Sequence, residues 1–311
     1  MKVFVTGGAG FIGSHVVSAI IDAGHSVTVF DDLSTGYEEY VDKRASFIKG
    51  DLANVEFLKN AVNGNDAVVH LASENNIADS VARPDYVLKR NVNNAINLLE
   101  CMRLNNINKL VFSSSSSVYG ENKKGLVRED SPKRPLQPYG ASKLAVESVI
   151  YGHHFAFGIN SVILRFFNVY GPRDDQLPVT RAIPTWVKSI ILGKAVPIFW
   201  GGKQIRDYIF VKDVARAVVF ALEKCDSIHE FNVGSGFALT MKQILDEVFA
   251  VAGKNVPVKD AGERKGDPPR LIADISSIKD VLGWSPLTGL KEGLKMTYDF
   301  YSTHPESLRR L

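Results

Sequence analysis

The stretch KVFVTGGAGFIGSHV, residues 2–16, decides the fold. It leads from a short apolar segment through Gly7, Gly10 and Gly13 into a helical pattern. Glycines at this spacing let the backbone turn tightly and approach a pyrophosphate, whose charge then lies at the positive end of the helix. Glycine turns are common, so the assignment depends on the strand before this turn and the helix after it. Together they predict a dinucleotide-binding unit.

The next apolar segment supplies the acidic group that such a unit requires. It ends in Asp31 and Asp32, at nearly the expected distance of about 20 residues from the glycines. An acid here accepts hydrogen bonds from the ribose hydroxyls and repels a 2′-phosphate. No arginine follows within DDLSTG at 31–36, so NAD is favoured over NADP. The competing interpretations are that Asp31 only caps a turn, and that Asp51, an expected adenine contact, is an ordinary turn aspartate.

The first 170 residues alternate short apolar runs with helical patterns. Nearly continuous hydrophobic runs bounded by Gly, Asp, Asn or Ser are typical of a parallel sheet covered on both faces. The alternation therefore predicts a doubly wound α/β fold. The predicted strands are 2–5, 26–30, 46–50, 66–72, 109–114 and 161–167, and the predicted helices are 11–23, 54–62, 91–105 and 139–157.

The regular alternation ends after Pro172. Beyond it we expect strands at 197–200, 207–211 and 230–236, and helices near 181–192, 213–223, 240–252, 275–282 and 287–301. This part is too irregular to fold independently. The sequence thus predicts a Rossmann NAD-binding domain over 1–170, with returning segments near 207–236, and a smaller mixed α/β substrate-binding lobe over 171–311.

Composition excludes several functional classes. The 311 residues carry a net charge of only +3, which gives no reason to expect a nucleic-acid partner. The two cysteines, Cys101 and Cys225, lie far apart and predict neither a disulfide framework nor a metal site. No apolar run reaches the roughly 20 residues that span a bilayer. The N-terminus also lacks a signal peptide's features, so we expect a cytoplasmic protein without a membrane partner.

A run of five serines, Ser113–Ser117, occurs within FSSSSSVYG at 112–120. Serine-rich runs are often flexible linkers, but this one directly follows a predicted buried strand. Ligands of doubly wound sheets bind beyond the carboxyl ends of the strands. Downstream, YGASK places Tyr139 and Lys143 four residues apart, on one helical face. We therefore interpret the serines as the lining of a site.

These residue types suit proton transfer. A phenol has a pKa of about 10, so a tyrosine base working near pH 7 needs a bias of about 4 kcal/mol toward phenolate. A nearby ammonium supplies much of this bias, and a positively charged nicotinamide adds to it. A serine hydroxyl donates and accepts at once and can relay a proton between a sugar hydroxyl and the tyrosine.

At this point the sequence resembles the extended short-chain dehydrogenase/reductase family, and within it the nucleotide-sugar 4-epimerases of the UDP-galactose/UDP-glucose type. The resemblance covers nearly the whole chain. The motifs that carry it are TGGAGFIGSH, DDLSTG, GDL, HLAS, SSSSSVYG, YGASK, RFFNVYGPR, RDYIFVKDVA and RKGDPPR followed by AD. The resemblance implies an NAD-dependent inversion at C4 of a UDP-hexose through a transient 4-keto intermediate.

The resemblance also implies roles for individual residues. The implied catalytic residues are the relay Ser115, the base Tyr139 and its modulator Lys143. The implied cofactor contacts are Gly7, Gly10, Phe11, Ile12, Gly13, Asp31, Asp32, Asp51, Leu52, Leu71, Ala72, Asn91, Ser113, Tyr139, Lys143 and Phe166. The implied substrate contacts are Ser115, Tyr139, Asn168, Arg206, Arg264, Asp267 and Leu271. No metal is implied.

Several positions depart from the family pattern. Ser73 replaces the usual alanine or glycine of HLAS, and Asn75 stands where some relatives carry a lysine, so Asn75 receives no role. Leu271 is intermediate in size at a position that restricts the sugar pocket in relatives, which leaves acceptance of N-acetylated sugars open. Ser116 and Ser117 follow the relay serine where related dehydratases and decarboxylases carry acids. This difference favours epimerisation.

Other activities remain as alternatives. One is a different NAD-dependent nucleotide-sugar enzyme, namely a decarboxylase, a dehydratase or a reductase, and another is a non-catalytic NAD-binding protein. The intact set of Ser115, Tyr139 and Lys143 argues against the second. The family resemblance implies a homodimer formed through 91–105 and 139–157, although the apolar stripes of these segments are equally compatible with packing on the sheet. The preferred sugar and the base selectivity stay open.

Overall fold

A parallel sheet of seven strands forms the centre of the molecule, in the order β11-β6-β5-β4-β1-β2-β3. The computed structural model describes residues 1–121, 125–175, 181–263 and 268–308. The strands are β1 (Lys2–Thr6), β2 (Ser26–Asp31), β3 (Ser46–Lys49), β4 (Ala67–His70), β5 (Lys109–Ser115), β6 (Asn160–Phe166) and β11 (His229–Val233). Every neighbouring pair in this sheet is parallel. The predicted doubly wound α/β fold is confirmed.

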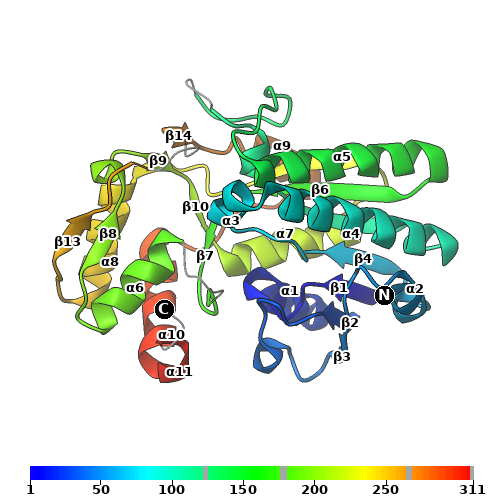
Figure 1. Cartoon of the computed structure of the whole chain (residues 1–311), viewed down its shortest axis with the longest axis horizontal. Helices are drawn as coiled ribbons and strands as arrows, with labels where there is room; N and C mark the ends of the chain where they lie inside the picture. Colours follow the sequence, from blue (N-terminus) through cyan, green and yellow to red (C-terminus); the bar gives the residue numbers. More distant parts are fainter. Residues whose placement is uncertain (122–124, 176–180, 264–267, 309–311) are drawn as a thin grey trace.

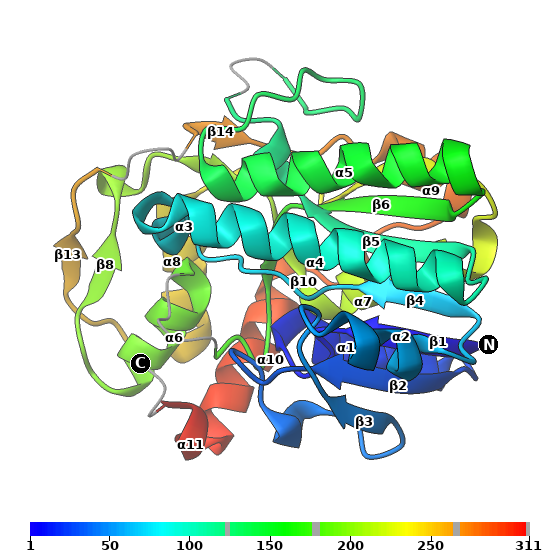
Figure 2. The ribbon, with the colours of Figure 1, turned by 45° about the vertical axis from the view of Figure 1, so that its right-hand side comes forward.

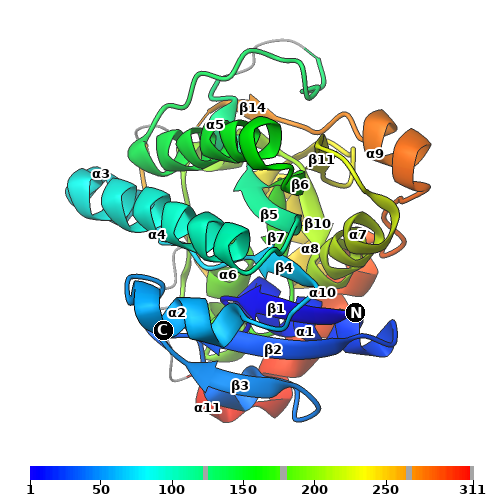
Figure 3. The ribbon, with the colours of Figure 1, turned by 90° about the vertical axis from the view of Figure 1, so that its right-hand side faces the viewer.

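Helices cover both faces of this sheet (Figure 3). On one face lie α2 (Val55–Val62), α4 (Pro84–Leu104) and α5 (Pro138–Phe157), and on the other lie α1 (Phe11–Asp22) and α7 (Val211–Lys224). Strand β1 illustrates why the central strands are apolar along their whole length. Phe4 packs into the apolar cluster beneath α2 and α4, whereas Val3 and Val5 pack into the cluster beneath α1. Because alternate side chains point to opposite faces, a strand buried on both sides must be apolar throughout.

Helix ends follow local chemistry that periodicity does not reveal. Helix α4 begins at Pro84, seven residues before the predicted start at 91, because proline fits the first helical position, whose N–H has no partner inside the helix. Helix α5 ends at Phe157, and Gly158 closes it at φ +71°. Glycine adopts this left-handed conformation without steric cost.

A second group of elements lies beyond the carboxyl ends of the central strands (Figures 1 and 2). Its helices are α6 (Ala182–Ile191), α8 (Met241–Ala252), α10 (Leu290–Thr303) and α11 (Pro305–Leu308), and its strands are β7 (Asn168–Tyr170), β8 (Val196–Ile198), β9 (Ile205–Arg206), β10 (Tyr208–Phe210), β12 (Leu239–Thr240), β13 (Val258–Asp260) and β14 (Arg270–Leu271). These strands form the small sheets β10-β7, β12-β9-β14 and β13-β8. The remaining short elements are α3 (Ile77–Ala82), α9 (Ser276–Leu282) and the 3₁₀ helices η1 (Glu38–Tyr40), η2 (Ser116–Val118) and η3 (Trp200–Gly202).

The chain returns to the central sheet after leaving it. Helix α7 packs against α1, and β11 extends the sheet beside β6. The predicted strand at 230–236 therefore exists, as His229–Val233. The division into a domain over 1–170 and a lobe over 171–311 stays a prediction. No helix within the described parts of the chain combines the length and the apolar character needed to cross a bilayer.

Candidate active site

The glycine turn between β1 and α1 leaves no room for a side chain at Gly7 or Gly13. Gly7 has a φ of +73°, and a Cβ built on it lies 2.6 Å from the backbone nitrogen of Ala72. A Cβ on Gly13 lies 2.0 Å from the carbonyl oxygen of Gly7. The first turn of α1 therefore sits directly on the loop, and its backbone N–H groups point beyond the strand ends. This geometry suits a pyrophosphate.

Asp31 supports the same turn from the end of β2. Its carboxylate accepts hydrogen bonds from the backbone nitrogens of Ala9 and Leu33, both at 2.9 Å. Burial raises the pKa of Asp31 above its usual value, and the two N–H groups oppose that rise. Asp31 thus caps the turn and also lines the adjoining pocket. The two interpretations drawn from the sequence are compatible, since each carboxylate oxygen can accept more than one hydrogen bond.

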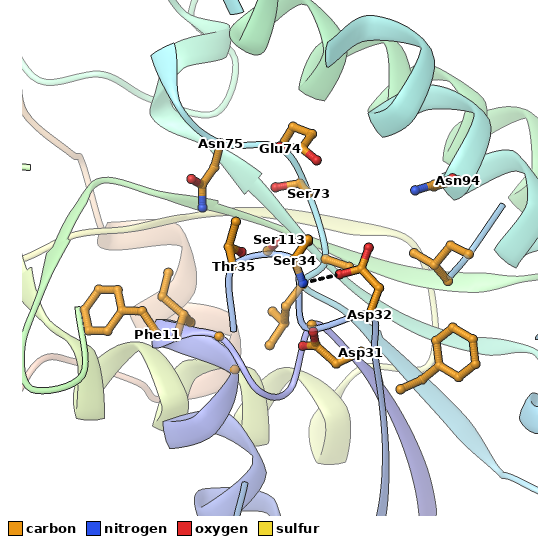
Figure 4. Close-up of a pocket in the computed structure, with 18 of the residues that line it drawn as sticks. Phe11, Asp31, Asp32, Ser34, Thr35, Ser73, Glu74, Asn75, Asn94 and Ser113 are labelled. Atoms are coloured by element: carbon orange, nitrogen blue, oxygen red, sulfur yellow. Dashed lines mark hydrogen bonds between the residues drawn. The ribbon is translucent and has the colours of Figure 1, made fainter. Parts of the chain in front are cut away.

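A pocket opens above this turn, and most of the predicted cofactor contacts line it. Figure 4 shows Asp31 and Asp32 on one side of the hollow, facing Ser73 and Glu74 across it. The predicted residues in its wall are Gly7, Gly10, Phe11, Ile12, Gly13, Asp31, Asp32, Asp51, Leu52, Leu71, Ala72, Ser113 and Phe166. These residues come from segments far apart in the chain, and the sheet brings their strand ends together. The donor set, a glycine turn with acidic groups at one end, fits NAD.

Of the other predicted cofactor contacts, Tyr139 and Lys143 line a second pocket, and Asn91 lines neither pocket. Its side-chain oxygen accepts from the backbone nitrogen of Glu74 at 2.7 Å. Its side-chain nitrogen donates to the Glu74 carbonyl oxygen at 3.0 Å and to the Ser142 hydroxyl at 2.9 Å. Asn91 therefore ties the loop after β4 to helix α5, and its expected direct contact with the cofactor stays a prediction.

The sequence did not reveal Arg90, which crosses one end of the pocket. Its guanidinium pairs with Asp51 at 3.2 Å, with Glu74 at 3.1 Å and also with Asp32. Asp32 additionally accepts from the backbone nitrogen of Ser34 at 2.8 Å (Figure 4). One cation thus joins three carboxylates from separate segments. The net charge at this end stays negative, which disfavours a 2′-phosphate.

A second pocket shares a wall with the first and contains the predicted catalytic residues. Ser115, Tyr139 and Lys143 all line it, and Phe11, Ser113 and Phe166 among others border both pockets. The Ser115 hydroxyl donates to the Ser117 hydroxyl at 3.1 Å, and Tyr139 faces the same pocket. The ammonium nitrogen of Lys143 donates to the carbonyl oxygen of Ser113 at 2.8 Å and lies 5.9 Å from the centre of the Tyr139 ring. The serine run is therefore the wall of a site and not a linker.

The electrostatics of this trio differ from the expectation. Burial raises the pKa of Tyr139 above its usual value, against the effects of the Ser115 hydroxyl and the charge of Arg181. Burial also lowers the pKa of Lys143 to about 7, against the opposing charge of Glu147. The expected depression of the tyrosine pKa is therefore absent in the chain by itself. Desolvation penalises the charged form of each group more than the two groups help each other.

The predicted substrate contacts have different outcomes. Asn168 and Arg206 line the second pocket. Leu271 does not. It pairs in register with Arg206 across β14 and β9, and its side chain packs in a buried apolar cluster with Val118 and Phe167. Phe167 itself lines the second pocket, so Leu271 lies behind that part of the wall, and its influence on the size of the sugar pocket stays a prediction. Arg264 and Asp267 lie outside the described residues.

Several pocket residues had no signal in the sequence. Arg181 borders both pockets, and its guanidinium pairs with the buried Asp174 at 2.5 Å. Phe199, Gln204 and Tyr208 line the second pocket near Arg206. All of them follow Pro172, where the regular alternation of strands and helices stops. No metal-binding cluster of His, Cys, Asp or Glu occurs in the described segments.

Residues 3–234 match the model of the NAD dependent epimerase/dehydratase family. The chain belongs to this family. A UDP-glucose 4-epimerase from Lacticaseibacillus casei is 34% identical over 98% of both chains. The fold is similar to that of a UDP-glucose 4-epimerase from Thermotoga maritima solved with UDP-glucose, with a TM-score of 0.91, 35% identity and coverage of 97% of this chain and 98% of the other. A UDP-N-acetylglucosamine 4-epimerase from Methanobrevibacter ruminantium, solved with UDP-N-acetylmuramic acid, also has a TM-score of 0.91, at 35% identity over 96% and 97% of the two chains.

Proposed function

We propose that the protein is an NAD-dependent epimerase that inverts C4 of a UDP-hexose, with UDP-galactose and UDP-glucose as its first expected substrates. The observation that carries the proposal is the second pocket, in which Ser115, Tyr139 and Lys143 converge beside the nucleotide pocket. Similarity over nearly the full length to UDP-glucose 4-epimerases supports it.

The pocket wall also favours epimerisation over elimination. Among the described residues that line the second pocket, no aspartate or glutamate occurs. Ser116 and Ser117 stand beside the relay serine in place of an acid. Removal of a proton from a neighbouring carbon, or protonation of a departing group, needs such a residue. A plain cycle of oxidation, rotation of the sugar and reduction needs only one acid–base group.

Each catalytic residue then has a defined task. NAD held at the glycine turn would supply reversible hydride transfer at C4 of the sugar. Tyr139 takes the O4 proton through Ser115 in the first half of the cycle and gives it back in the second. Lys143, held by the Ser113 carbonyl, favours the phenolate form of Tyr139.

The diphosphate must stay bound while the sugar turns over. Arg206 is 6% exposed and lines the second pocket, so its guanidinium is the proposed anchor, with Asn168 beside it. A planar guanidinium donates two parallel hydrogen bonds to phosphate oxygens. The proposed contacts of Arg264 and Asp267 with the diphosphate and the ribose rest on the family resemblance.

Incubation of the purified protein with UDP-galactose, without added reductant, tests the proposal. We expect UDP-glucose on chromatography at constant NADH absorbance, because the reaction has no net redox change. Release of carbon dioxide from UDP-glucuronic acid, or net formation of NADH, would instead identify one of the alternative activities. UDP-N-acetylgalactosamine is the next substrate, because the intermediate size of Leu271 leaves acceptance of N-acetylated sugars open.

We further propose a cytoplasmic homodimer formed through α4 and α5. These helices pack side by side on the outside of the sheet, and Phe155 and Phe157 at the end of α5 are 78% and 53% exposed. Both cysteines are free and buried, which suits a reducing compartment. Light scattering at micromolar concentration and cell fractionation test the two parts of this proposal.

A further inference from the structure

Three residues of α5 that are spaced four apart face three consecutive serines of β5. Ser115 and Tyr139 line the same pocket, and the Ser113 carbonyl oxygen accepts from Lys143 at 2.8 Å. The Ser114 hydroxyl donates to the Glu147 carboxylate at 2.5 Å. Side chains four apart lie above one another on a helix, so strand and helix meet at three successive levels. The proposed function uses only the first two.

The contact between Ser114 and Glu147 also includes Arg165 on the neighbouring strand β6. Arg165 stands directly opposite Ser114 in the register of β5 and β6, so both side chains point toward α5. Its guanidinium donates to both oxygens of Glu147, at 2.9 and 2.8 Å. The side chains of Arg165 and Glu147 are 0% and 3% exposed. A buried carboxylate with three fixed donors holds its helix in one position relative to the strands, because any sliding of the helix would leave a buried charge without partners.

We propose that Glu147 is a positioning residue of the reaction: by joining Ser114 on β5 to Arg165 on β6, it sets the height of α5 and thereby places Tyr139 and Lys143 at the reacting sugar oxygen. The kinetic effects expected of this inference rest on the proposed function. The effect of the α5 position on the titration of Tyr139 does not.

Glu147 also acts on Lys143 through its charge. Several groups from neighbouring elements face Lys143: His70 on β4, the Phe112 ring and the Ser113 carbonyl on β5, and Tyr139 and Glu147 on α5. His70 is neutral, since burial lowers its pKa to about 3. From α4, Asn91 contacts α5 through Ser142. Glu147 is thus the carboxylate that opposes the desolvation of the Lys143 ammonium.

The surroundings of Glu147 define a matched control. Arg165 also pairs with Glu230 on β11 and donates to the Tyr119 hydroxyl at 2.9 Å and to the Glu129 carbonyl oxygen at 3.1 Å. Tyr151 donates to Glu230. Glu230 therefore shares the same arginine as Glu147, but its bonds to Arg165 and Tyr151 do not join it to the serine run.

The test compares Glu147→Gln with Glu230→Gln in the NAD-loaded protein. We expect Glu147→Gln to lower kcat for UDP-galactose by about tenfold or more while KM changes by less than about threefold, because the loss falls on proton transfer and not on substrate binding. The basic limb of its pH–rate profile should move to lower pH, since Lys143 loses its proton more easily. Glu147→Asp should restore the position of that limb, and Ser114→Ala should lower kcat without moving it. Glu230→Gln should change neither property.

A second readout does not need the enzyme to epimerise anything. The ionisation of Tyr139 is measured by phenolate absorbance over a range of pH. For each protein, the absorbance of the same protein carrying Tyr139→Phe is subtracted. Loss of the Glu147 carboxylate should displace α5 and shift this titration, and loss of the Glu230 charge should leave it in place. Equal titrations in the two variants, or equal losses of kcat that follow their melting temperatures, would overturn the role of Glu147. A wild-type protein that does not convert UDP-galactose but shows the expected titrations would refute only the proposed substrate.

Discussion

Replacement of Gly13 by alanine should disrupt the cofactor site through one methyl group. The added Cβ would lie 2.0 Å from the carbonyl oxygen of Gly7 and 2.8 Å from the Cα of Gly8. Ordinary contacts between such atoms are about 3.5–4.0 Å, so α1 and the turn must separate by roughly 1.5 Å. Both contacts are backbone, and no side chain can rotate away to relieve them.

The expected cost of this overpacking is about 1–3 kcal/mol. At roughly 2–4 °C per kcal/mol, the melting temperature should fall by several degrees. The same displacement moves the N–H groups that face the pyrophosphate, so the purified variant should retain less than about a tenth of the wild-type NAD, a loss of roughly 1.4 kcal/mol or more. Thermal unfolding and NAD released on acid denaturation measure the two effects.

Gly152→Ala is the matched control. Gly152 lies inside α5 and is exposed, and a Cβ added to it would meet no atom of the described residues within 4 Å. Alanine there should raise stability by about 0.5–1 kcal/mol through helix propensity and leave NAD binding unchanged. If Gly13→Ala kept the wild-type NAD content and melting temperature, the tight turn would not be what the cofactor site depends on.

Three further outcomes follow from the structure. Tyr139→Phe should lower kcat for UDP-galactose by about 10²–10⁴-fold with NAD still bound, and a near-normal rate would remove Tyr139 from the mechanism. Arg165→Met should cost about 3–5 kcal/mol in urea unfolding, because Glu147 and Glu230 lose the cation that pairs with both, and a loss below about 1 kcal/mol would contradict this account. The pKa of His70 is lowered to about 3 by burial, so the unfolded chain binds a proton that the folded chain does not as pH falls below about 6.5. Stability should therefore decline by up to about 1.4 kcal/mol per pH unit from this residue, and the slope measured by unfolding should be smaller in His70→Asn.

The proposed role of Tyr139 as a base depends on both pockets. Burial alone raises the pKa of Tyr139 and lowers the pKa of Lys143 to about 7, so the chain by itself does not hold a ready phenolate. A cation bound beside Tyr139 would shift that balance toward phenolate. Acid–base strength at this site is therefore expected to depend on an occupied nucleotide pocket, which adjoins Tyr139 through Ser113 and Phe166.

Local sequence patterns were sufficient to predict features that are formed by a few neighbouring residues. The glycine turn, the acid at the end of β2 and the Tyr139–Lys143 spacing each lie within a few residues, and the structure brings them to the same edge of the sheet. Residues whose hydrogen-bond partners lie far away in the sequence gave no such pattern. The amide of Asn91, for example, is hydrogen-bonded to Glu74 and Ser142 from other segments.

The amino-acid sequence was enough to predict the doubly wound fold, the glycine turn and the shared helical face of Tyr139 and Lys143, because hydrophobic period, glycine spacing and helical spacing are local properties of the chain. Only the folded chain shows that Arg90 joins three carboxylates at one end of the first pocket, that Leu271 packs behind Phe167, and that Glu147 meets Arg165 beneath the serines. The role of a buried charged side chain depends on the ion-pair and hydrogen-bond partners that surround it. Those partners come from strands and helices that only the folded sheet places side by side.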